Sequence, residues 1–190
     1  MKTVNYLVTI SAILGLVGNT IALEERTSDM KTAKEWMLVQ TGPKPIFAAF
    51  PNKPTEMHFG LPVANTPETG VLKVLCTEEA GHTFFLCTIQ GEENTLYLSA
   101  EQLQKTFRQT LVPYLFYDAT TSWGDLMDAH KTSCCNRPAL AFQASSNGQW
   151  LRGLTFLENG QVQHILFLIA PQEQWDDLAA NTFLQSVQAP

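Results

Sequence analysis

The sequence predicts an α+β domain in which an antiparallel sheet is flanked by helices. Three observations lead to this fold class: a hairpin signal in the first half, two Asn-Gly pairs between β-rich runs in the second half, and two amphipathic helical segments. Antiparallel strands that follow one another along the chain bury one face against helices in such folds. The chain shows no internal repeat and no low-complexity tract.

The chain begins with the pattern of a secretory signal peptide. Lys2 precedes a mostly apolar stretch, and Thr20-Ile21-Ala22 forms a small-x-small cleavage site before a charged segment. The apolar stretch is shorter than the about 20 residues that span a membrane. An uncleaved anchor is the alternative, but the pattern favours an exported protein, periplasmic or secreted. The expected organisation is a signal peptide over 1–22, a mature chain from Leu23, a flexible lead over 23–35 and one α+β domain over 36–190.

The first half is expected to hold short strands and a hairpin. Apolar runs at 36–39 and 46–50 surround the turn signal TGPKP, and FPNKPTE after them leaves regular structure. The runs at 71–77 and 83–90 flank Gly81, which suits a hairpin turn. This hairpin forms the N-terminal part of the predicted sheet.

A first helix is expected to begin after Ser99. The segment SAEQ is a capping box, with Ser99 as the N-cap residue and Gln102 reaching back to it. Leu103, Phe107 and Leu111 recur every four residues and make one apolar stripe. Such a stripe indicates a helix that packs against a sheet.

The second half carries the strongest signals. The segments SSNGQ and ENGQ each place Asn-Gly between β-rich runs, and Asn-Gly favours a two-residue type I′ turn. Around the second turn, Glu158 should therefore face Gln161. The last strand is apolar on both faces, so it should be central or covered. The predicted C-terminal meander has strands over 138–146, 149–158 and 161–170.

The final helix is expected over 173–187. Asp176 and Asp177 fall in its first turn, where a carboxylate complements the helix dipole. Its predicted apolar face consists of Trp175, Leu178, Ala179, Phe183 and Val187.

Two stretches resemble small secreted proteins of the PsbP-like fold. FAAFPNKPTE is similar to the opening strand and Phe-Pro-x-Lys-Pro turn of that fold. The closing meander of that fold and its Phe-Leu-x-Ser helix have counterparts here in the segments NRPALAFQASSNGQWLRGLTFLENGQVQHILFLIAP and NTFLQSV, which resemble them. The resemblance covers about 36–187. The resemblance implies an antiparallel sheet flanked by helices. It implies no catalytic residues, because members of this fold have different roles, from stabilising a photosynthetic complex to binding proteins.

Composition and motifs exclude several function classes. The net charge is −6 and no basic run is present, which argues against a nucleic-acid partner. The chain lacks a Gly-x-Ser-x-Gly elbow, a His-Glu-x-x-His motif and a phosphate-binding Gly loop. The four histidines are scattered, and His164 is expected to be a satisfied histidine within the sheet. We expect no cofactor, no metal and no integral membrane span after signal cleavage.

The cysteines are Cys76, Cys87, Cys134 and Cys135. An even number in an exported chain favours disulfides, and four cysteines allow three connectivities. A bond between neighbours is strained, because their Cα atoms lie about 3.8 Å apart, below the usual range of disulfides. With a turn centred on Gly81-His82, Cys76 and Cys87 stand directly opposite each other on one face. We therefore expect each of them to be linked to Cys134 or Cys135.

Three function classes are compatible with these observations. The first is an exported, non-catalytic binding or accessory protein with a protein partner, for which Trp123 in the polar segment TTSWGD is the predicted contact. The second is a thiol-redox or metal-handling protein that uses the four cysteines; His130 and Cys134, four residues apart, would share a face of a helix. The third is a small hydrolase with dispersed catalytic residues, which would need a pocket that gathers histidine with carboxylate or hydroxyl groups.

Overall fold

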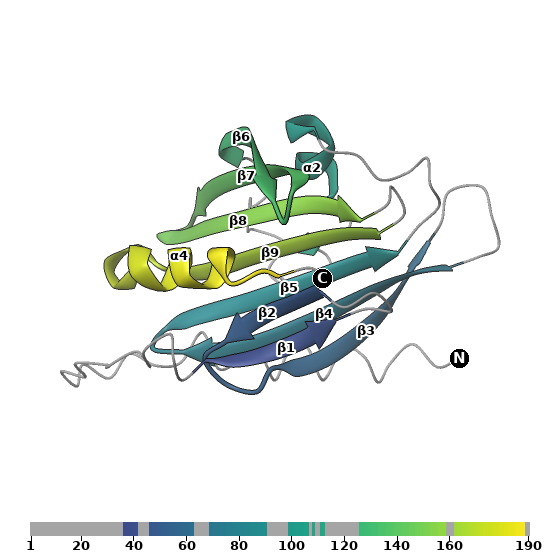
Figure 1. Cartoon of the computed structure of the whole chain (residues 1–190). Coiled ribbons are helices and arrows are strands. Elements are labelled where there is room, and N and C mark those ends of the chain that lie inside the picture. Colours follow the sequence, from purple (N-terminus) through teal and green to yellow (C-terminus); the bar gives the residue numbers. More distant parts are fainter. Residues whose placement is uncertain are drawn as a thin grey trace, which may run out of the picture.

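A computed structural model of the chain describes residues 36–41, 46–62, 69–90, 99–106, 108, 111–112, 126–158 and 162–188. They form a seven-stranded antiparallel sheet and a separate two-stranded antiparallel sheet (Figure 1). The smaller sheet pairs β1 (Met37–Thr41) with β2 (Ile46–Phe50). The larger sheet has the order β3-β4-β5-β9-β8-β7-β6. Its strands are β3 (Thr55–Pro62), β4 (Thr69–Glu79), β5 (His82–Gln90), β6 (Leu126–Cys134), β7 (Arg137–Ser146), β8 (Gln149–Glu158) and β9 (Val162–Pro171).

The predicted α+β class with flanking helices is wrong. The described residues are mostly antiparallel β-structure and include only two short α-helices, α2 (Ala100–Thr106) and α4 (Asp177–Gln185), besides the 3₁₀ turn η3 (Gln172–Gln174). The prediction failed because the β1–β2 hairpin, rather than a helix, covers much of one face of the sheet. Two further strands, β3 and β6, also occupy segments for which no strand was expected.

Two of the predicted hairpins are confirmed. The β4–β5 turn places Ala80 and Gly81 at positive φ, and the β7–β8 turn does the same with Asn147 and Gly148. Positive φ at both central residues is the signature of a type I′ turn, whose twist matches that of the strands. The first of these turns is centred on Ala80-Gly81 rather than on Gly81-His82.

The junction between β8 and β9 differs from the prediction. Glu158 pairs with Val162 instead of Gln161, so three residues rather than two separate the paired ends. Asn159 and Gly160 lie outside the described residues. Because side chains alternate between the two faces of a strand, this shift of one residue moves every predicted cross-strand partner to the other face. Phe156 consequently faces His164.

Strand β9 is the fourth of seven strands, which confirms its predicted central position. It pairs with β5 on one side and β8 on the other (Figure 1). Its eight inner residues are all buried. A strand covered on both faces needs apolar side chains at successive positions, and HILFLIA meets this need. β9 therefore joins the N-terminal hairpin to the C-terminal meander.

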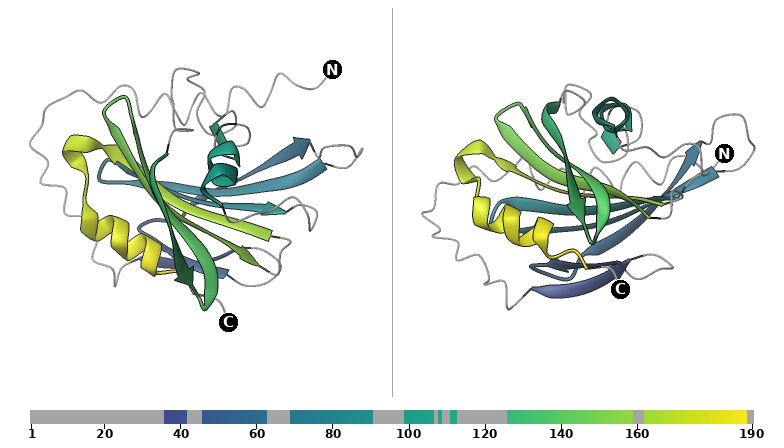
Figure 2. Two further views of the ribbon diagram at one scale, coloured as in Figure 1. Left: turned by 90° about the horizontal axis from the view of Figure 1, so that it is seen from above. Right: turned by 45° about the horizontal axis from the view of Figure 1, so that its top comes forward.

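The sheet has a separate hydrophobic core on each face. Helix α2 lies over one face of the sheet, and the β1–β2 sheet and α4 lie over the other (Figure 2). On one face, Leu103 and Leu111 are fully buried, as the predicted helical stripe requires, whereas Phe107 lies outside the described residues. On the other face, the β1–β2 sheet and α4 pack against the central strands through Ile46, Phe50 and Phe183.

Helix α4 begins four residues later than predicted. The carboxylate of Asp176 caps it by accepting hydrogen bonds from the backbone N–H groups of Leu178 (2.7 Å) and Ala179 (3.3 Å). Ala180 and Phe183 are buried as its inner face, but Leu178 is 75% exposed, so its predicted place on that face is wrong. The buried face is therefore made of Ala179, Ala180 and Phe183 and does not extend to Leu178.

Several predictions fall on residues outside the described part of the chain. These are the signal peptide over 1–22, the flexible lead over 23–35 and the contact residue Trp123. Among the helices that the structure describes, none is long and apolar enough to cross a membrane.

Candidate functional site

Two of the four cysteines are core residues on the α2 face of the sheet. Cys76 and Cys87 belong to the same hydrophobic cluster as Leu103 and Leu111. They lie on one face, as predicted, but diagonally rather than directly opposite, because Cys76 pairs with Phe85. Burial raises the pKa of Cys76 to about 12 and raises that of Cys87 as well, so both remain protonated thiols near neutral pH.

The other two cysteines lie at the opposite face. Cys134 packs in the cluster that contains Phe156 and Phe183, and Cys135 packs against the edge of that cluster. All four thiols are free. The predicted links between the hairpin cysteines and Cys134 or Cys135 are therefore absent, because the sheet itself separates the two pairs.

A shared metal site is not formed either. His130 and Cys134 are on strand β6, not on a helix, so four residues separate them by about 13 Å along the strand. Within the described residues, no group of three or more His, Cys, Asp or Glu side chains could hold a metal ion.

A groove of about 580 Å³ runs between α4 and the strands β6, β7 and β8. Cross-strand pairs form its floor: Asp128 pairs with Gln143, which pairs with Arg152, and the next floor row contains His130, Ala141 and Leu154. In this row Ala141 has a smaller side chain than its cross-strand neighbours His130 and Leu154. The fold thus leaves a groove of mixed polar and apolar lining beside α4.

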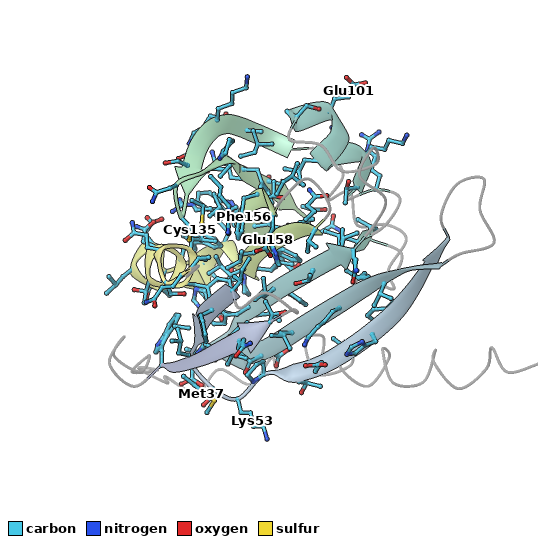
Figure 3. All side chains as sticks on the ribbon, turned by 45° about the vertical axis from the view of Figure 1, so that its right-hand side comes forward. Met37, Lys53, Glu101, Cys135, Phe156 and Glu158 are labelled. Atoms are coloured by element: carbon cyan, nitrogen blue, oxygen red, sulfur yellow. The ribbon has the colours of Figure 1, made fainter. Side chains whose placement is uncertain are left out.

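The groove wall contributed by α4 carries the polar Asn181 and Gln185 on either side of the apolar Leu184. Asn181 and Gln185 are one turn apart and exposed, and both line the groove opposite the sheet floor. Together with Gln143 they provide three side-chain amides, each of which both donates and accepts hydrogen bonds. Cys135 also lines the groove, and its sulfur contacts the backbone carbonyl of Val187 just after α4 (Cys135 is labelled in Figure 3).

Arg152 is held in place near the first turn of α4. Its guanidinium lies 2.8 Å from an Asp177 carboxylate oxygen and 5.4 Å from the ring centre of Trp175. The Trp175 indole N–H donates to Asp177, and this hydrogen bond, with the charge of Arg152, lowers the pKa of the Asp177 carboxyl. The charge of Arg152 is therefore largely matched before any ligand enters the groove.

A buried polar chain lies under the β1–β2 sheet. The Nδ1 atom of His164 is 3.2 Å from the Thr88 hydroxyl, and its Nε2 atom is 3.3 Å from a Glu158 carboxylate oxygen. The other carboxylate oxygen of Glu158 lies 3.6 Å from Arg137. Desolvation lowers the pKa of His164 even though Glu158 opposes this shift. The prediction of a satisfied histidine within the sheet is confirmed.

The series Thr88, His164 and Glu158 has the hydroxyl–imidazole–carboxylate order that hydrolases use. However, His164 has no exposed surface, and it does not line the groove. A substrate carbonyl cannot approach the Thr88 hydroxyl in this arrangement, so these residues support the interior of the protein rather than a reaction.

A comparison with models of known protein families and with curated protein sequences finds no match. The site therefore rests on the geometry alone. Sequence reasoning missed Gln143, Arg152, Asn181 and Gln185. The available signal was the alternation in β7, where Ala139, Ala141 and Gln143 point to one face as a row of short and polar side chains next to bulky apolar residues.

Proposed function

We propose that the chain is an exported, non-catalytic binding protein that holds an extended peptide segment of a partner protein in the groove between α4 and β6–β8. The observation that carries this proposal is the groove itself, whose volume of about 580 Å³ is within the range of ligand sites. Its lining comes from both a helix and a sheet, which are regular elements of the fold.

The chemistry of the lining favours a peptide. The amides of Gln143, Asn181 and Gln185 can pair with the N–H and C=O groups of an extended main chain, which presents both in alternation. Asp128 and His130 lie 3.6 Å apart on the exposed edge strand, and Arg152 is paired with Asp177. The charges of the groove are therefore mixed, which suits a peptide better than a strongly charged ligand.

A peptide-selection experiment tests this proposal. Peptides selected from a random library on the immobilised protein should bind the wild-type protein in calorimetry. Ala141→Trp fills the floor of the groove and should weaken binding at least about tenfold, which is about 1.4 kcal/mol. Val71→Trp is the matched control, because Val71 is exposed on β4 at the far side of the sheet. This control should leave the affinity unchanged.

A second variant covers the case in which the large side chain disturbs the fold. Asn181→Ala with Gln185→Ala removes two exposed amides from α4 and should also weaken binding while leaving the melting temperature within about 2 °C. Full affinity in this variant and in Ala141→Trp would contradict the proposed groove. Binding that only Val71→Trp abolishes would place the contact elsewhere.

Export is tested separately. Mass spectrometry of the protein recovered outside the cytoplasm should find Leu23 at the N-terminus, because Thr20-Ile21-Ala22 matches a signal-peptidase site. Retention of Met1 to Ala22 would contradict this part of the proposal. The resemblance to the PsbP-like proteins stays a prediction.

A further inference from the structure

The turn between β6 and β7 brings two thiols together at the end of the groove. Cys134 pairs with Arg137, so Cys135 and Asn136 are the two central residues of the turn, with φ of 52° and 60°. The other two turns of this kind have Gly at their second position, and Asn-Gly is the preferred pair. Cys135 therefore occupies a left-handed backbone conformation that is sterically unfavourable for a residue with a Cβ atom.

The two sulfur atoms face each other. The Cys134 Sγ lies 3.8 Å from the Cys135 Sγ, and the Cys135 Sγ lies 3.4 Å from the backbone carbonyl of Val187. Cys134 is 8% exposed, whereas Cys135 is half-buried, and both line the groove. A small molecule in the groove can thus reach Cys135 first, with Cys134 directly behind it.

We propose that Cys134 and Cys135 are a redox-active dithiol, which a small aliphatic disulfide entering the groove oxidises to a disulfide between the neighbouring residues. The Cys135 thiolate attacks one sulfur of the incoming disulfide, forms a mixed disulfide and releases one thiolate. The Cys134 thiol then loses its proton to water, attacks the Cys135 sulfur and releases the second thiolate. The two cysteines lose two electrons and two protons, and the small disulfide is reduced to two thiols.

The strain of the product makes the reaction reversible. Neighbouring Cα atoms lie about 3.8 Å apart, below the usual span of about 4.4–6.8 Å for disulfides. Strained disulfides are easily reduced, and they are regulatory or catalytic rather than structural. Burial and the adjacent Cys135 raise the pKa of Cys134 to about 12, which further favours the reduced pair. This assignment is independent of the ligand of the groove, and it separates the four cysteines into a reactive pair and a core pair.

Trypsin provides a direct test, because it separates the two pairs. Cleavage after Lys131 and Arg152, with Pro138 protecting Arg137, leaves Cys134 and Cys135 on the peptide 132–152. Cys76 and Cys87 are together on the peptide 74–105. The purified, reduced protein is equilibrated in buffers of reduced and oxidised glutathione, unfolded, alkylated and analysed by mass spectrometry.

The expected result is that 132–152 loses two hydrogen atoms in oxidising buffers, carries no glutathione and regains both thiols with dithiothreitol. The peptide 74–105 should still be alkylated at both cysteines. Cys134→Ser should retain glutathione on Cys135, because the second step is then blocked. Cys76→Ser is the control and should leave the oxidation of 132–152 unchanged.

Other outcomes overturn the proposal. They are full alkylation of 132–152 in the most oxidising buffer, retention of glutathione by the wild-type peptide, or oxidation confined to 74–105. Because the wild-type protein alone decides among these, misfolding of a variant cannot rescue the proposal. Cys135→Ser, in which the more accessible thiol is removed, must also show no glutathione on Cys134 at the time when wild-type oxidation is complete.

Discussion

Replacing Phe183 by alanine tests how α4 is attached to the sheet. The Phe183 ring is fully buried and makes edge contacts with Phe50 of β2 and Phe84 of β5, both at 5.3 Å between ring centres. It is therefore the residue through which the helix, the two-stranded sheet and the seven-stranded sheet meet. Its loss should affect all three at once.

The magnitude follows from these contacts. Truncating a buried phenylalanine to alanine lowers the free energy of unfolding by about 3–5 kcal/mol, which includes the cost of the cavity that remains. Each aromatic pair adds about 0.5–1.5 kcal/mol beyond the buried area, so Phe183→Ala should lie near the upper end of that range. Leu178→Ala on the same helix should change stability by less than about 0.5 kcal/mol, because Leu178 is 75% exposed.

Urea unfolding followed by circular dichroism measures both variants. With a slope of about 2 kcal/mol per molar urea, Phe183→Ala should shift the midpoint down by about 2 M, and Leu178→Ala should leave it in place. The pair separates two orientations of the helix, because the sequence alone placed both residues on the buried face. Equal losses in the two variants, or a loss below about 1 kcal/mol in Phe183→Ala, would refute the packing described here.

Further predictions concern the interior of the sheet. Because burial lowers the pKa of His164, the unfolded chain takes up a proton at this residue at a higher pH than the folded chain does. The stability of the protein should therefore fall as the pH drops below about 6.5. His164→Gln should make the melting temperature nearly independent of pH between about pH 7 and pH 5.5. An unchanged slope would show that other groups cause the loss. Gly153→Ala should cost about 1–3 kcal/mol in urea unfolding, because the added Cβ would lie 2.3 Å from the Phe142 ring. Gly148→Ala meets no atom within 4 Å and should cost only the strain of its positive φ, about 1–2 kcal/mol; a greater loss here than at Gly153 would contradict the packing of β7 on β8.

The elements that the sequence predicted well are those with local signals. Gly81 and Gly148 fix hairpin turns through backbone conformations that few other residues adopt, and the apolar residues of β9 predict a covered strand. The two strands that sequence reasoning missed, β3 and β6, are the edges of the sheet. Edge strands carry charged residues and proline to prevent pairing with other chains, and these same residues hide them from a search for alternating apolar positions.

The candidate site was less predictable because it depends on contacts between distant segments. Alternation within the β4–β5 hairpin correctly placed Cys76 and Cys87 on one face. That alternation could not show that Cys134 faces the opposite side of the sheet, because the β4–β5 hairpin and the β6–β7 hairpin are connected within the sheet only through β9 and β8. The groove likewise requires α4 to lie over β8 and β9, and no local pattern specifies where Asn181 stands relative to Gln143.

The central place of β9 sets an order of events during synthesis. β5 pairs with β9 across a long separation, with Thr83 opposite Ile169. While the ribosome makes the intervening chain, β5 is an outer strand whose side chains are apolar on both sides, and such a strand readily joins strands of other chains. The first three strands of the sheet therefore need protection from aggregation until Pro171 has left the ribosome. Nascent chains arrested just before Val162 should bind holdase chaperones more strongly than chains released from the ribosome after Pro190.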